Sequence, residues 1–209
     1  VKMETNYPWE GTVKINVSTV KNIKLNMHLR IPGYVNGIAA PGALYHFADT
    51  ASAKPIIKIN GIAVNYTVEK GYAVINREWK KDDVVEMTIP MAIKKIIARD
   101  ELKQDNDRMA LQLSPLIYCF EGADNNGKAW NFIMPANADF KVENFKVKDE
   151  SVIALVSNLP VVNVNADGTA LTTGLQQVKA IPYYTWCNRG SNPMQVWLPV
   201  KIKDIKINN

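Results

Sequence analysis

The sequence is poor in the side chains that most often bind metals or act as general bases. Its 209 residues include only two histidines, His28 and His46, and two cysteines, Cys119 and Cys187. No two of these residues have the short spacing that is typical of zinc ligands, such as two cysteines separated by two residues. We therefore expect no metal site and no cofactor built from this chain alone.

The same shortage argues against catalysis. A serine or cysteine nucleophile needs a base within hydrogen-bonding distance, and the sequence has no Gly-x-Ser-x-Gly motif. Two groups of carboxylates remain as candidates for a glycosidase-type pair. Glu121 and Asp124 follow a long apolar run, where such side chains commonly accept hydrogen bonds from loop amides. The other group surrounds a lysine-rich turn that is typical of a solvated hairpin end: Glu78, Asp82, Asp83 and Glu86. We predict no catalytic residue in this chain.

Long hydrophobic segments are also missing. The sequence has neither a signal-peptide core nor an apolar span of about 18 residues, so we expect no membrane partner. The net charge is +5, but lysines such as Lys24 and Lys58 alternate with apolar residues, which indicates solvated strand faces and no nucleic-acid partner. Cys119 lies inside an apolar run, which favours a buried free thiol over a disulfide. The first residue is Val1 rather than Met, which suggests a piece of a longer protein.

What the sequence does contain is a series of short alternating segments. In residues 23–31, apolar side chains at every second position face one way and Lys24, Asn26, His28 and Arg30 face the other. This period of two predicts a β-strand. Asn60-Gly61 and Lys70-Gly71 are typical of tight hairpin turns. Strands separated by turns every 8–12 residues or so predict an all-β fold with two antiparallel, jelly-roll-like β-sandwich domains.

The domain boundary is inferred from composition. Residues 33–54 show little periodicity and predict a long loop. We expect a strand at 91–97, a polar connector at 98–107, and a buried strand at 108–124 that Pro115 interrupts. The predicted domains are therefore 1–97 and 108–209. In the second domain we also expect a turn at 166–168 and a closing strand at 200–207.

Exposed aromatic side chains offer one route to a binding function. Sugars dock their apolar faces on exposed tryptophan or tyrosine rings, and β-sandwiches commonly present such rings. The candidates for carbohydrate binding are Trp130, Tyr183, Tyr184 and Trp186. The alternative is that these rings pack in a core or at a domain interface.

Several stretches together resemble a known family. They are TNYPWEG at 5–11, LRIPG at 29–33, GYAVINREWKKDDVVEMTIPM at 71–91, RMALQLSPLIYCFEGAD at 108–124 and IPYYTWCNRGSNPMQVWLP at 181–199. In this order and spacing they resemble the region that follows the catalytic barrel in β-L-arabinofuranosidase-like glycoside hydrolases of family 127. The long loop at 33–54 and the Leu-Ser before Pro115 depart from the family pattern.

The resemblance implies an accessory role for this chain. In that family an (α/α)6 barrel performs catalysis, with a cysteine nucleophile at a zinc site, and we expect that barrel upstream of Val1. None of its motifs matches a residue here, so zinc is expected only in the barrel. The expected partners are this barrel, a second copy in a homodimer, and carbohydrate. The resemblance suggests a periplasmic or extracellular location. The alternatives are a carbohydrate-binding module and a structural docking or dimerisation domain.

Overall fold

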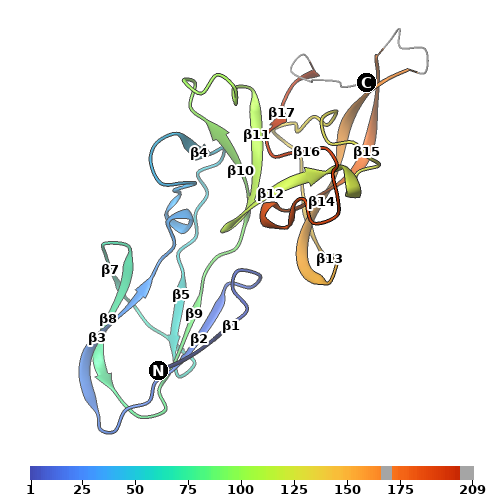
Figure 1. Ribbon diagram of the computed structural model, residues 1–209. Coiled ribbons are helices and arrows are strands. Elements are labelled where there is room, and N and C mark those ends of the chain that lie inside the picture. Colours follow the sequence, from blue (N-terminus) through green and yellow to red (C-terminus); the bar gives the residue numbers. More distant parts are fainter. Residues whose placement is uncertain (166–170, 203–209) are drawn as a thin grey trace. The chain divides into compact units, whose positions relative to one another are not determined.

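The computed structural model in Figure 1 describes residues 1–165 and 171–202 and divides into two compact units. Unit 1 comprises Val1–Pro41 and Thr50–Ala92, and unit 2 comprises Gly42–Asp49 and the chain from Ile93 onward. The helical elements in the described residues are three single 3-10 turns: η1 (Gly33–Asn36), η2 (Gly122–Asp124) and η3 (Tyr183–Thr185). The predicted all-β fold is confirmed. No helix among these residues is long and apolar enough to cross a membrane.

Unit 1 is a sandwich of two antiparallel sheets. The larger sheet has the strand order β1-β2-β9-β5-β6, and the smaller has the order β3-β8-β7. The strands of the larger sheet are β1 (Lys2–Thr5), β2 (Thr12–Asn16), β5 (Ile56–Ile59), β6 (Ile62–Ala63) and β9 (Val84–Thr88). Those of the smaller sheet are β3 (Ile23–Arg30), β7 (Thr67–Glu69) and β8 (Tyr72–Trp79).

The core of unit 1 lies between these sheets. Ile15, Ile57 and Val85 of the larger sheet belong to the same buried cluster as Ile75 and Trp79 of β8. Their burial follows from the two-residue period, which places alternate side chains of each strand on the inner face. The alternation predicted for 23–31 is present toward the end of β3, where Leu29 is buried, whereas Ile23 and Leu25 at its beginning remain exposed.

Unit 2 is built on one antiparallel sheet with the order β13-β14-β15-β12-β11-β10-β4. Two short strands extend it, because β16 pairs with β12 and β17 pairs with β11. Its strands are β4 (Tyr45–Phe47), β10 (Ile93–Ala98), β11 (Arg108–Leu113), β12 (Leu116–Glu121), β13 (Lys141–Val147), β14 (Glu150–Val164), β15 (Leu171–Pro182), β16 (Met194–Gln195) and β17 (Leu198–Pro199).

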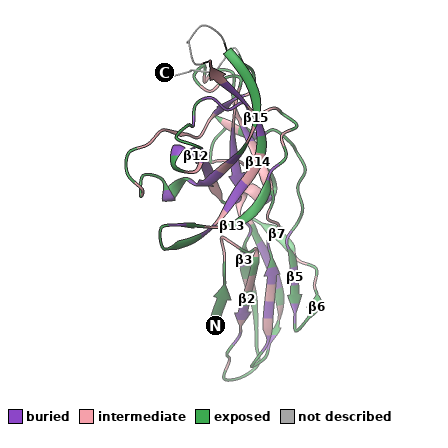
Figure 2. Ribbon diagram, turned by 90° about the vertical axis from the view of Figure 1, so that its right-hand side faces the viewer, coloured by how far each residue is buried: buried purple, intermediate pink, exposed green. Residues whose placement is uncertain are grey.

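The core of unit 2 gathers residues from most of this sheet. Leu111, Phe120, Leu155 and Val178 of four different strands share one cluster with Phe132, which lies in the segment after η2. Figure 2 shows the consequence: β12 is largely buried, whereas β15 is exposed along its first half and buried only toward its end. The end of β15 is therefore held firmly, and η3 follows it directly.

The predicted boundaries differ from the observed ones in three places. The run 108–124 forms a hairpin of β11 and β12 rather than one strand, because Pro115, in a cis peptide with Ser114, occupies the turn between them. Apart from Ala98, which ends β10, the predicted connector 98–107 is the loop joining β10 to β11 inside unit 2, since β10 pairs with β11. The predicted loop at 33–54 contains β4, whose Phe47 pairs with Ile96 of β10. The turn expected at 166–168 and most of the strand expected at 200–207 lie outside the described residues.

Candidate functional site

The four aromatic residues singled out in the sequence all lie in unit 2 and are all exposed. The exposed fractions are 38% for Trp130, 45% for Tyr183, 49% for Tyr184 and 37% for Trp186. Side chains of this size bury most of their surface when they belong to a core. These four rings are therefore available at the surface of the unit, although they come from two distant stretches of the chain.

The turn η3 places two of the rings side by side. Pro182 ends β15, and the Thr185 hydroxyl donates a hydrogen bond of 2.7 Å to the Pro182 carbonyl oxygen. In a 3-10 turn, residues three apart in sequence lie on the same side. The rings of Tyr183 and Trp186 accordingly stack, with their planes 14° apart and their centroids separated by 6.1 Å. Tyr184 points elsewhere and donates a 2.7 Å hydrogen bond to Glu150.

Trp130 is fixed by a hydrogen bond across the chain. Its indole Nε1 donates to the carbonyl oxygen of Met194 at 3.0 Å. Both neighbours of Trp130 are buried, Ala129 and Asn131, so the backbone on either side is held by packing. The ring is thus held in a defined orientation even though part of it faces solvent.

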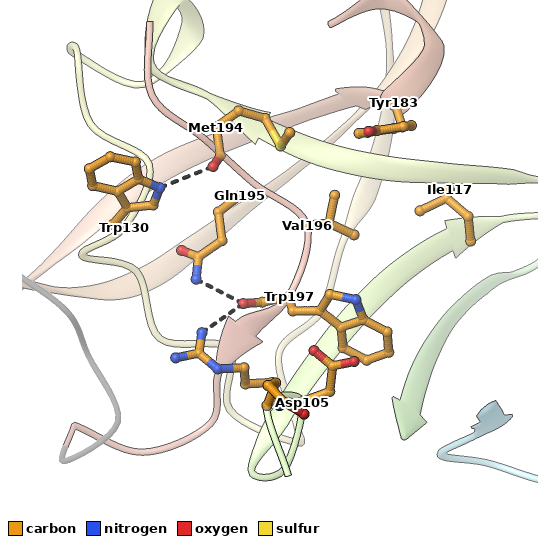
Figure 3. A pocket seen from close by; sticks show the side chains of 10 residues that line it. Asp105, Ile117, Trp130, Tyr183, Met194, Gln195, Val196 and Trp197 are labelled. Carbon is orange, nitrogen blue, oxygen red and sulfur yellow. Dashed lines mark hydrogen bonds between the residues drawn. The ribbon is translucent and has the colours of Figure 1, made fainter. Parts of the chain in front are cut away.

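Trp130 and Met194 line two hollows at once. The first, of about 760 Å³, is also lined by Tyr183, Gln195 and Trp197. Figure 3 shows this hollow, in which the Gln195 amide donates to the Trp197 carbonyl oxygen at 2.8 Å, and Arg108, on β11, donates to the same oxygen at 3.0 Å.

The second hollow has a volume of about 840 Å³ and is also lined by Trp186, Asn131 and Asn163. The Asn163 side-chain oxygen accepts hydrogen bonds from Lys128 Nζ at 2.7 Å and from Asn131 Nδ2 at 3.2 Å. Three of the four predicted aromatic residues therefore line the hollows, namely Trp130, Tyr183 and Trp186. Tyr184 lines neither of them.

A buried ion pair positions the loop that leads into β16, the strand that begins at Met194. Glu121 at the end of β12 has no exposed surface, and it forms an ion pair with Arg189, which also binds Asp124. The Arg189 Nη1 donates to Asp124 Oδ1 at 2.6 Å, and the hydrogen bond with Asp124 raises the pKa of the guanidinium further above its usual range. The Asn192 amide donates to Glu121 at 2.9 Å. The two carboxylates therefore anchor this loop.

The two cysteines differ in their surroundings. Cys119 is buried in β12 and Cys187 is exposed, and both are free thiols. Burial, together with the nearby carboxylates of Glu121 and Asp124, raises the pKa of the Cys119 thiol to about 12. A thiol with such a pKa stays protonated and is a poor nucleophile at neutral pH.

Across residues 1–165 and 171–202, no group of three or more histidine, cysteine, aspartate or glutamate side chains could hold a metal ion. In the lysine-rich turn, Asp83 accepts hydrogen bonds from the Lys80 backbone amide at 2.9 Å and from the Asn60 side chain at 2.8 Å. Asp83 is therefore held as part of the turn.

Sequence reasoning missed the second half of the aromatic site. The candidate residues named from the sequence do not include Met194, Gln195 or Trp197. The contact between Trp130 and Met194 joins residues 64 positions apart, so no periodic pattern could reveal it. The one available signal was the density of aromatic residues between 183 and 197.

Comparison with known proteins matches both units. The glycoside hydrolase family 127 C-terminal domain matches residues 93–199, and the β-L-arabinofuranosidase family 127 middle domain matches residues 1–91. The division between these two matches falls where the two compact units divide after Ala92.

Individual relatives agree with this assignment. The chain is 27% identical to a non-reducing end β-L-arabinofuranosidase of Bifidobacterium longum subsp. longum over 94% of this chain and 30% of that protein. A solved family 127 β-arabinofuranosidase superposes with a TM-score of 0.90 and 32% identity over 98% of this chain and 32% of that chain. A family 127 β-L-arabinofuranosidase from Geobacillus stearothermophilus T6 has a TM-score of 0.79 and 30% identity over 94% of this chain and 30% of its own. The chain thus spans about a third of the length of these relatives.

Proposed function

The chain belongs to glycoside hydrolase family 127, and from this we propose that it is the non-catalytic accessory part of a β-L-arabinofuranosidase-like enzyme, made of the middle and C-terminal β-sandwich domains. The relatives are about three times as long as this chain. We propose that the residues that cleave the glycosidic bond belong to the part of such an enzyme that this chain does not match. The accessory part would support a helical catalytic barrel.

The observation that carries this proposal is the coverage of the superposition. The TM-score of 0.90 extends over 98% of this chain but takes up only 32% of the solved relative. The chemistry of the described residues supports it, since Glu121 and Asp124 are committed to Arg189 and Cys119 is buried and protonated. The parent reaction, retaining hydrolysis of an arabinofuranoside, would then depend on residues of the barrel.

A chimera tests the accessory role. In the Geobacillus relative, the matching third of the chain would be replaced by these 209 residues, and a second variant would lack that third altogether. We expect the chimera to be soluble and to release arabinose from an arabinofuranoside, and the deleted variant to aggregate or lose activity. A deleted variant as stable and active as the intact relative would contradict the proposal.

Carbohydrate binding is a second candidate function, and the exposure of the four aromatic residues favours it. A third candidate is docking to the barrel or to a second copy of the chain. Ile23 and Leu25 of β3 support it, because both lie on the inner side of the smaller sheet of unit 1 and yet remain 43% and 40% exposed. Contiguous exposed apolar surface commonly marks an interaction site.

A further inference from the structure

We propose that the two hollows beside Trp130 form one groove for a neutral oligosaccharide, with one sugar unit held on each side of Trp130 and Met194. The choice of an arabinose-containing sugar rests on the proposed function, whereas the groove itself rests on the geometry of unit 2. We call this feature the Trp130 groove and define it by Trp130, Met194, Tyr183 and Trp186, together with the amides of Gln195 and Asn131.

The shape of the groove supports more than one sugar unit. The hollows measure about 760 and 840 Å³ and share Trp130 and Met194, so they adjoin each other. Each lies within the usual range of small-ligand pockets, roughly 300–1,000 Å³. Each also has an aromatic ring of its own, Tyr183 in the first and Trp186 in the second. A ligand that fills only the first hollow would not contact Trp186, and one that fills only the second would not contact Tyr183.

The aromatic rings are already in place before a ligand binds. Trp130 is held by its hydrogen bond to Met194, and Tyr183 and Trp186 stack on each other. Ordering a mobile side chain on binding costs free energy, so rings that are fixed in advance lose less of the binding energy. The apolar faces of sugar rings can therefore pack on surfaces that need little rearrangement.

Each hollow also contains a buried amide with an unused acceptor. Within the part of the chain that the structure describes, the Gln195 Oε1 in the first hollow has no hydrogen-bond partner. The same holds for the Oδ1 of Asn131 in the second hollow, whose side chain is only 7% exposed. Leaving a buried acceptor unpaired is costly, so such groups generally find a partner. Both oxygens are covered in the free chain, so a sugar hydroxyl would bond to either of them only after the amide turns into the hollow.

The polar lining favours a neutral ligand over a charged one. The first hollow carries one acidic and one basic side chain, Asp105 and Arg108, so neither sign dominates. In the second, Lys128 keeps its positive charge while it donates to Asn163, and the other polar side chains of the lining are neutral amides and the Ser191 hydroxyl. Amides that both donate and accept are suited to hydroxyl groups, which do the same.

The test is a titration of the full chain with oligosaccharides of one to four β-linked L-arabinofuranose units, followed by calorimetry and tryptophan fluorescence. We expect the affinity to rise about tenfold or more from the monosaccharide to the di- or trisaccharide, because the second unit binds at a high effective concentration. Tyr183→Ala and Trp186→Ala should each lower the affinity for the longer ligand about tenfold and abolish most of its advantage over arabinose.

Tyr184→Ala is the matched control, because Tyr184 is equally exposed and adjacent in sequence but lines neither hollow. It should leave the affinity unchanged. Thermal unfolding of each variant shows whether the fold is intact. The groove is refuted by an absence of binding to every oligosaccharide, by an affinity independent of ligand length, or by an equal loss in Tyr184→Ala. None of these results would change the outcome expected for the chimera, which tests the accessory role separately.

Discussion

Replacing Arg189 by leucine should destabilise unit 2 strongly. The substitution removes the guanidinium that pairs with Glu121 and Asp124, whose side chains are only 0% and 5% exposed. Removing one partner of a buried ion pair typically costs about 3–5 kcal/mol, because a charge is left uncompensated away from water. Here two carboxylates would be left, so we expect a loss in this range. With a urea m-value of about 2 kcal/mol/M, the unfolding midpoint of unit 2 should fall by roughly 2 M.

The assay is urea unfolding followed by circular dichroism, with Arg99→Leu as the matched control. Arg99 pairs with Glu101 at 2.7 Å, but both side chains are exposed, at 47% and 68%, so its loss should cost about 1 kcal/mol or less. Adding Glu121→Gln and Asp124→Asn to Arg189→Leu should recover most of the stability, since no buried charge then remains. Equal midpoints for the Arg189 and Arg99 variants would refute this interpretation of the ion pair.

Three further predictions concern single side chains. The hydrogen bond that the Lys80 backbone amide donates to Asp83 is the main cause of the lowered pKa of the Asp83 carboxyl. The stabilisation that this carboxylate provides is therefore complete above about pH 4, the usual aspartate pKa, and is lost as the pH falls through the lowered pKa. Asp83→Asn should therefore cost about 1–3 kcal/mol at pH 7, and the difference in unfolding free energy from the wild type should shrink on acidification. A thiol reagent should label Cys187 alone in the native protein and Cys119 only after denaturation, as mass spectrometry would show. Gly122→Ala should destabilise by about 1–3 kcal/mol in thermal unfolding, because its Cβ would lie 2.9 Å from the facing proline ring, whereas Gly174→Ala meets nothing within 4 Å and should be tolerated.

Local signals in the sequence predicted the fold class well. The turn Asn60-Gly61 has positive φ angles of 52° and 81° and joins β5 to β6, as the hairpin signal requires. Lys70-Gly71 has φ angles of 51° and 81° and joins β7 to β8 in the same way. Such turns depend on residues adjacent in sequence, which is why they can be recognised without knowledge of the fold.

Features that depend on distant pairing could not be predicted in this way. An alternating pattern identifies a strand but does not say which strand pairs with it, so β10 was placed in the first domain although it pairs with β4 and β11. The candidate site has the same limit. Tyr183 and Trp186 are neighbours through a local turn, whereas Trp130 reaches the site only through its hydrogen bond to Met194. Sequence reasoning therefore listed the rings, and the structure separates Tyr184 from the other three.

Hydrolysis by the isolated chain tests the accessory role most directly. The purified 209-residue chain would be incubated with p-nitrophenyl β-L-arabinofuranoside, with and without added zinc, beside the intact Geobacillus relative as the positive control. We predict that the chain releases no p-nitrophenol above the buffer blank while the relative does. Release by the chain that disappears on Glu121→Gln or Cys119→Ala, in variants that remain folded, would show that catalysis resides in these sandwiches and would contradict the account.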